Sequence, residues 1–163
     1  MNRPNAFKDD PMAQLDGTVD ISKKDMSYRR AIAESTLHAP TEVIEAIKGD
    51  GLPKPDPLAT ARAAGMLAAK QTPNLIPHCH PIALTDIRLD FHFTEHTVTV
   101  RCEATACDRT GPEIEALCGA SVAALTLYDM VKGICRSAKI TETRLVEKEG
   151  GKSGHWREEN SDA

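Results

Sequence analysis

Asp129 and Lys132 are the first candidates for chemistry, because a carboxylate and an ammonium stand three residues apart. On a helix, side chains at this spacing are neighbours. Such a pair is most often a solvated ion pair worth about 0.3–0.5 kcal/mol, and the spacing alone favours that interpretation. Held together in a pocket, the same two groups could act as acid and base.

A second candidate is the segment LIPHCHP, which places His78, Cys79 and His80 between two prolines. Proline on both sides excludes a helix and stiffens the loop. A zinc site is disfavoured, since three adjacent residues cannot all turn toward one ion. Cys79 could be a nucleophile, but a cysteine is more often a packed thiol. We favour a histidine of this loop as a donor to a ligand.

Three cations accompany the alanine-rich segment that follows residue 56: Lys54 before it, and Arg62 and Lys70 within it. Each could be solvated, or together they could surround a phosphate. Asp20 could be a ligand or a turn residue, and for an isolated aspartate the turn is favoured.

A long helix over residues 110–134 must position the first pair. Thr110 as N-cap and Glu113 three residues later match a capping box, and Pro112 is tolerated only in a first turn. Small residues along this helix predict a close approach to a sheet or to a second helix. The expected buried stripe consists of Leu117, Ser121, Ala124, Leu125 and Tyr128.

Two more helices are predicted at 41–48 and 58–74, the second with Asp56 as N-cap and Pro57 as its first residue. Helix competes with strand only over 28–37. The expected fold is α+β, a ferredoxin-like antiparallel sheet with helices packed on one face. Uncovered edges and small-residue helix surfaces predict a symmetric homo-oligomer. Alternating apolar residues predict strands at 28–37, 83–94, 97–107 and 139–147, the middle two forming a hairpin.

The chain of 163 residues predicts one α+β domain over 18–148, between a mobile tail at 1–17 and a flexible tail at 149–163. A net charge of −4 argues against nucleic-acid binding. We expect no membrane span and no signal peptide, hence a cytoplasmic protein. Five scattered cysteines fit packed thiols in a reducing compartment. GGKSG lacks the spacing of a Walker loop.

The motifs are Lys54-x-Asp56, the alanine-rich segment 59–70, Leu75-Ile76-Pro77-x-Cys79-His80-Pro81, Thr110-Gly111-x-Glu113-x-Glu115-Ala116-Leu117, the segment 120–132 ending in Tyr128-Asp129-Met130-x-Lys132, and Gly150-Gly151-Lys152-Ser153-Gly154. In this order they resemble the MoaC family, the cyclic pyranopterin monophosphate synthases of molybdenum cofactor biosynthesis. The resemblance covers about residues 19–154.

This resemblance implies a lyase that converts 3′,8-cyclo-7,8-dihydro-GTP into cyclic pyranopterin monophosphate and releases pyrophosphate by general acid–base catalysis. It also implies a homohexamer built as a trimer of dimers, with the active site at a subunit interface. No organic cofactor and no protein-bound metal are expected, and Mg²⁺ accompanying the triphosphate is left open.

Under the resemblance, Asp129 and Lys132 are the catalytic acid and base, and Lys54 matches a second essential lysine. The implied substrate-binding residues are His78, Cys79, His80, Ile114 and Glu115. Further candidates for ligand or phosphate contacts are Asp20, Arg29, Lys70 and Glu113, the last of which could instead serve only as the helix cap. The departures from the family pattern are His78 in place of Leu, Pro55-Asp56-Pro57 in place of Gly-Asp-Val, and Gly17-Thr18 in place of a basic residue and Met.

Two alternatives stay open at this point. One is a non-catalytic oligomeric relative that binds nucleotides, which would keep the fold and the basic loops. The other is a zinc hydrolase that uses His78 and His80.

Overall fold

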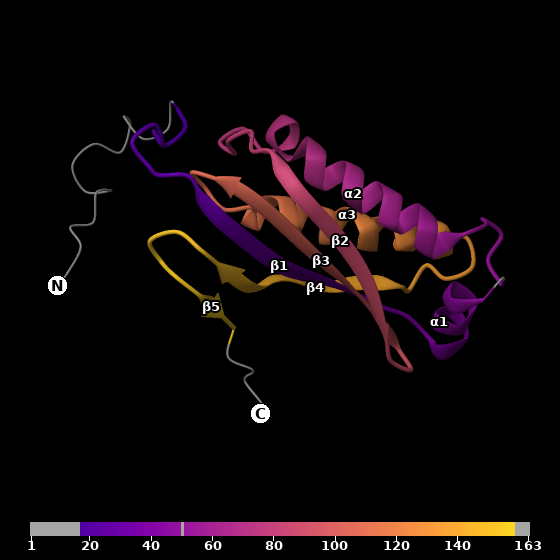
Figure 1. The fold of residues 1–163 in the computed structure, drawn as a ribbon. Helices are drawn as coiled ribbons and strands as arrows, with labels where there is room; N and C mark the ends of the chain where they lie inside the picture. The colour runs from indigo at the N-terminus through magenta and orange to yellow at the C-terminus, as the bar shows by residue number, and fades with distance from the viewer. Residues whose placement is uncertain (1–16, 50, 159–163) are drawn as a thin grey trace.

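A computed structural model describes residues 17–49 and 51–158 as one antiparallel sheet covered by helices (Figure 1). The strands lie in the order β2-β3-β1-β4-β5. The helices lie on one face, so the predicted α+β fold of ferredoxin-like type is confirmed. The strands are β1 (Ser27–His38), β2 (Leu84–Phe93), β3 (Thr97–Asp108), β4 (Lys139–Glu149) and β5 (Trp156–Arg157). The helices are α1 (Thr41–Lys48), α2 (Pro57–Leu75) and α3 (Glu113–Val131).

Strand β1 lies at the centre of the sheet and pairs with β3 and β4 along its length. Its alternation places Ala31, Ala33 and Leu37 in the core beneath the helices. The opposite face carries ion pairs, such as Arg30 to Glu103 at 3.0 Å. The competing helical interpretation of residues 28–37 is therefore wrong.

Helices α2 and α3 cross closely where glycine meets glycine. A Cβ on Gly65 would lie 2.8 Å from the carbonyl oxygen of Gly119, and a Cβ on Gly119 would lie 2.6 Å from Sγ of Cys102. Both positions must therefore stay glycine for α3 to pack closely against both α2 and β3. The predicted close approach of this helix is confirmed.

The start of α3 differs from the prediction. The helix begins at Glu113, with Pro112 in the N-cap position and no side-chain cap bond. Thr110 is therefore not the cap, and the Glu113 carboxylate contacts Lys148 at 3.4 Å instead. Asp56 precedes α2 in a left-handed conformation, φ 50°, and its side chain does not cap that helix either.

The buried face of α3 also differs from the prediction. Leu125 is 56% exposed, and Leu117 and Ser121 are only partly buried. The core is filled instead by a face that combines small side chains with Leu127. The reason is the close crossing, which admits only small residues at its centre. The other buried residues of this face include Ala116, Gly119, Ala120, Ala123, Ala124, Met130 and Val131.

Two further findings concern the ends of the fold. Trp156 of β5 lies in the segment 149–163, for which a flexible tail is predicted, and it pairs with Lys148 of β4. The predicted tail at 1–17 lies almost wholly outside the described residues. By length and composition alone α3 could cross a membrane, but half of that window is buried inside the fold, as in the core helix of a globular domain.

Candidate active site

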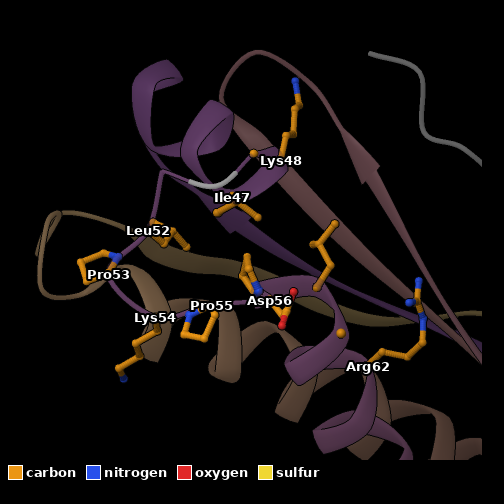
Figure 2. Close-up of a pocket in the computed structure, with 12 residues that line it drawn as sticks. Ile47, Lys48, Leu52, Pro53, Lys54, Pro55, Asp56 and Arg62 are labelled. Atoms are coloured by element: carbon orange, nitrogen blue, oxygen red, sulfur yellow. The ribbon is translucent and has the colours of Figure 1, made fainter.

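At the C-terminal end of α3, one carboxylate contacts two ammonium groups. Nζ of Lys132 lies 2.6 Å from Oδ1 of Asp129, one helical turn away. Lys54 arrives from the loop before α2, where its Nζ donates to Oδ2 and, at 3.1 Å, to the carbonyl oxygen of Asp129. In Figure 2 the Lys54 side chain extends away from Ile47 and Asp56, with which it lines a cavity between α1 and α2. We call this trio the carboxylate–lysine cluster.

The two lysines set the charge state of the cluster. Hydrogen bonds, first from Lys132 and then from Lys54, lower the pKa of Asp129 to about 2, and the bond to Asp129 raises the pKa of Lys132. At neutral pH Asp129 is therefore a carboxylate and Lys132 an ammonium. About half of each side chain is exposed, so a ligand or a second chain that covered the cluster would change these pKa values by desolvation.

At the N-terminal end of α3, Glu115 is 2% exposed although it is a carboxylic acid. The Sγ of Cys79 donates to Oε1 of Glu115 at 3.5 Å, and Oε2 has no hydrogen-bond partner among residues 17–49 and 51–158. Burial raises the pKa of Glu115, and burial with the nearby Glu115 carboxyl raises the pKa of Cys79 to about 12. Cys79 is therefore a protonated thiol, and the thiolate-nucleophile alternative is not supported.

The burial of Glu115 predicts that Glu115→Gln stabilises the protein at neutral pH. Because its pKa is raised, the folded state binds more protons than the unfolded state above about pH 4.5, so stability falls as pH rises from there. The variant removes that loss. In thermal unfolding between pH 4 and 8, the Tm of Glu115→Gln should equal that of the wild type at pH 4. The variant's Tm should exceed the wild-type Tm by an amount that grows with pH.

Glu42→Gln is the matched control, because Glu42 also lies in the first turn of a helix but is exposed. It should show no gap that grows with pH. A Tm difference between Glu115→Gln and the wild type that stays constant across this pH range would contradict a raised pKa for the buried Glu115 carboxyl.

Beside the start of α3 lies a cavity of about 580 Å³ with a positive lining. Nε of Arg29 donates to the carbonyl oxygen of Asp108 at 2.8 Å, and its guanidinium forms no other hydrogen bond within residues 17–49 and 51–158. Five cations face two carboxylates, and such a surplus suits a polyanion. The cations are Lys24, Arg29, Arg109, Lys148 and Lys152, and the carboxylates are Asp25 and Glu113. Sequence reasoning identified Arg29 and Glu113 and missed the other charged residues, which come from three separate stretches of the chain, 24–29, 109–113 and 148–153.

The LIPHCHP loop and the N-terminal segment lie together. Nδ1 of His78 contacts the carbonyl oxygen of Gly17 at 3.0 Å. Oδ1 of Asp20 accepts from the backbone of Ser22 at 2.8 Å, which confirms the turn, and this bond, with His80 contributing least, lowers the pKa of Asp20. No group of three or more His, Cys, Asp and Glu side chains within the described part of the chain could hold a metal ion.

The remaining candidates are more widely spread. Ile114 is partly exposed on α3, and Lys70 is exposed on α2. The guanidinium of Arg62 donates to the carbonyl oxygen of Leu89 at 3.2 Å and lies 5.2 Å from the Phe91 ring centroid. Arg62 therefore faces β2, and it also lines, with Lys54, the cavity between α1 and α2. Lys70 is not among the residues that line this cavity, so the three cations do not share it.

The candidate residues thus form two groups at opposite ends of α3. Fourteen residues separate Glu115 from Asp129, which corresponds to about 21 Å along a helix. Figure 1 shows the same separation, with the β4–β5 turn at one end of the molecule and the loop between α1 and α2 at the other. The two groups do not meet within one chain.

Known proteins share this sequence over nearly its full length. Residues 18–151 match the model of the MoaC family. The chain is 47% identical over 138 residues to the cyclic pyranopterin monophosphate synthase of Streptomyces avermitilis, covering 85% of this chain and 81% of that protein. It is 42% identical over 163 residues to the Streptomyces coelicolor protein of that name (95% and 96%), and 46% over 143 residues to the Pelobacter propionicus one (86% and 89%). The chain therefore belongs to the MoaC family.

Proposed function

We propose that this protein converts 3′,8-cyclo-7,8-dihydro-GTP into cyclic pyranopterin monophosphate and pyrophosphate, as a lyase of molybdenum cofactor biosynthesis. The observation that carries the proposal is the carboxylate–lysine cluster, in which Asp129 contacts both Lys54 and Lys132. Its relatives carry the name of this synthase, and the cationic cavity supplies the charge that a nucleoside triphosphate requires.

The reaction opens one ring, closes another and forms a cyclic phosphate as diphosphate departs, so each step moves protons. Lys132 is held as an ammonium by Asp129 and is the proton donor of the cluster. Desolvation of the cluster beneath bound substrate would lower the pKa of Lys132, so that the ammonium gives its proton to the substrate more easily. The neutral amine that remains can then accept a proton in a later step. The cations of the cavity would stabilise the charge that builds up on the departing diphosphate.

The complete site requires two chains under this proposal, because the two groups are about 21 Å apart along one α3. Between these two groups, α3 exposes an apolar surface that includes Leu125, which is 56% exposed. Under this proposal a second copy of the chain covers that surface. A trimer of dimers, a cytoplasmic location and the absence of an organic cofactor belong to the same proposal. Mg²⁺ would enter with the triphosphate as part of the substrate.

The direct test is incubation of the purified protein with 3′,8-cyclo-7,8-dihydro-GTP. We expect substrate loss with one pyrophosphate released for each cyclic pyranopterin detected by chromatography. If the protein bound the compound and returned it unchanged, the chain would be a binding protein and the proposed function would be wrong.

A further inference from the structure

The turn between β4 and β5 contains three glycines with positive φ: Gly150 at 99°, Gly151 at 70° and Gly154 at 64°. Only two of them are crowded. A Cβ on Gly151 would overlap Nη1 of Arg29 and lie 3.0 Å from its Cζ, whereas a Cβ on Gly154 would have no neighbour within 4 Å. The backbone at Gly151 therefore lies directly against the Arg29 guanidinium.

The other side of this guanidinium is held by the sheet. Arg29 lies on β1 opposite Ala106, and its Nε donates to the carbonyl oxygen of Asp108 at 2.8 Å where β3 ends. The Arg29 guanidinium is therefore contacted both by the β4–β5 turn at Gly151 and by the Asp108 carbonyl at the end of β3. Arg29 lines the same cavity as Lys148 and Lys152.

We propose that Gly151 is a positioning residue, which fixes Arg29 for binding a polyphosphate in the cationic cavity. A guanidinium fixed before binding loses less conformational freedom when it forms a bidentate pair with a phosphate. The same turn carries Lys152 and Ser153 to the cavity wall. This inference rests on the proposed function in one respect, which is that the triphosphate of the substrate binds in this cavity.

The test compares Gly151→Asn with Gly154→Asn, since asparagine tolerates a left-handed backbone best among the other residues. Both variants carry similar backbone strain, and only the first meets Arg29. Calorimetric titration with inorganic tripolyphosphate should show affinity weakened about tenfold or more for Gly151→Asn and unchanged for Gly154→Asn. KM should rise in parallel for the first, with a smaller change in kcat. Gly151→Ala introduces the same Cβ and replaces it if Gly151→Asn does not fold.

Arg29→Ala completes a double-mutant cycle. If Gly151 acts through Arg29, adding Gly151→Asn to Arg29→Ala should change tripolyphosphate affinity less than twofold. The inference is overturned if a folded Gly151 variant binds tripolyphosphate like the wild type, or if its full effect persists without Arg29. Turnover of the wild-type protein is measured separately in the same series. If the variants change tripolyphosphate affinity as expected but the wild type does not turn over the substrate, the proposed function is wrong and the role of Gly151 stands.

Discussion

Lys132→Ala is expected to lower kcat by about 10²- to 10⁴-fold, the usual contribution of a positioned acid or base. The variant removes the ammonium that lies 2.6 Å from Asp129 and leaves that carboxylate with Lys54 alone. Because Lys132 is exposed, folding should not depend on it. Pyrophosphate release and cyclic pyranopterin formation should fall together, while thermal unfolding and oligomer size stay as in the wild type.

Two further variants identify what is lost. Lys48→Ala removes an ion pair of the same i, i+3 spacing and the same 2.6 Å distance, to Glu45 on α1, and should keep full turnover. Lys132→Arg keeps the positive charge beside Asp129 but cannot release its proton at neutral pH, so it should be nearly as inactive as Lys132→Ala. An active Lys132→Arg would limit Lys132 to an electrostatic role and contradict proton transfer by this residue.

The sheet was predictable from sequence because alternation is a local property of each strand. Residues 28–37 alternate, and the competing helix is excluded only by pairing with β3 and β4. The caps were not predictable, since Thr110 fits a capping box that the chain does not form. The packed face of α3 was mispredicted because large residues such as Leu125 suggested a core position, whereas the crossing at Gly65 selects small ones.

The contacts of the candidate site could be predicted where the two residues are close in the sequence, and could not where they are far apart. Asp129 and Lys132 belong to one helical turn, so their spacing predicted their contact. Lys54 joins them from 75 residues away. Its position in the sequence suggested only a possible phosphate contact, and the resemblance to a family alone indicated a catalytic role. Cations such as Lys24 and Arg109 reach the cavity from different segments, each with no pattern of its own. Contacts between residues far apart in the sequence therefore determine which cations line the cavity, and composition and periodicity do not predict such contacts.

The distance between the two ends of α3 leads to the second large effect, which is recovery of activity by mixing two inactive proteins. One parent carries Lys132→Ala in the carboxylate–lysine cluster. The other carries Arg29→Ala and Lys148→Ala in the cationic cavity, whose lining these two cations share. Each parent is expected to be nearly inactive at low substrate concentration, because every site it forms lacks one of the two groups.

If each site takes its carboxylate–lysine cluster from one chain and its cavity from another, an oligomer that contains both parents can join an intact cluster to an intact cavity. With random mixing of equal amounts, one half of the clusters and one half of the cavities are intact, so about a quarter of the sites are complete. Co-expression with two affinity tags and sequential purification should therefore give about a quarter of wild-type activity per site. If the mixed protein were no more active than its parents, both groups would serve one site within a single chain. That chain would then have to bring residues from opposite ends of α3 together, which its fold opposes.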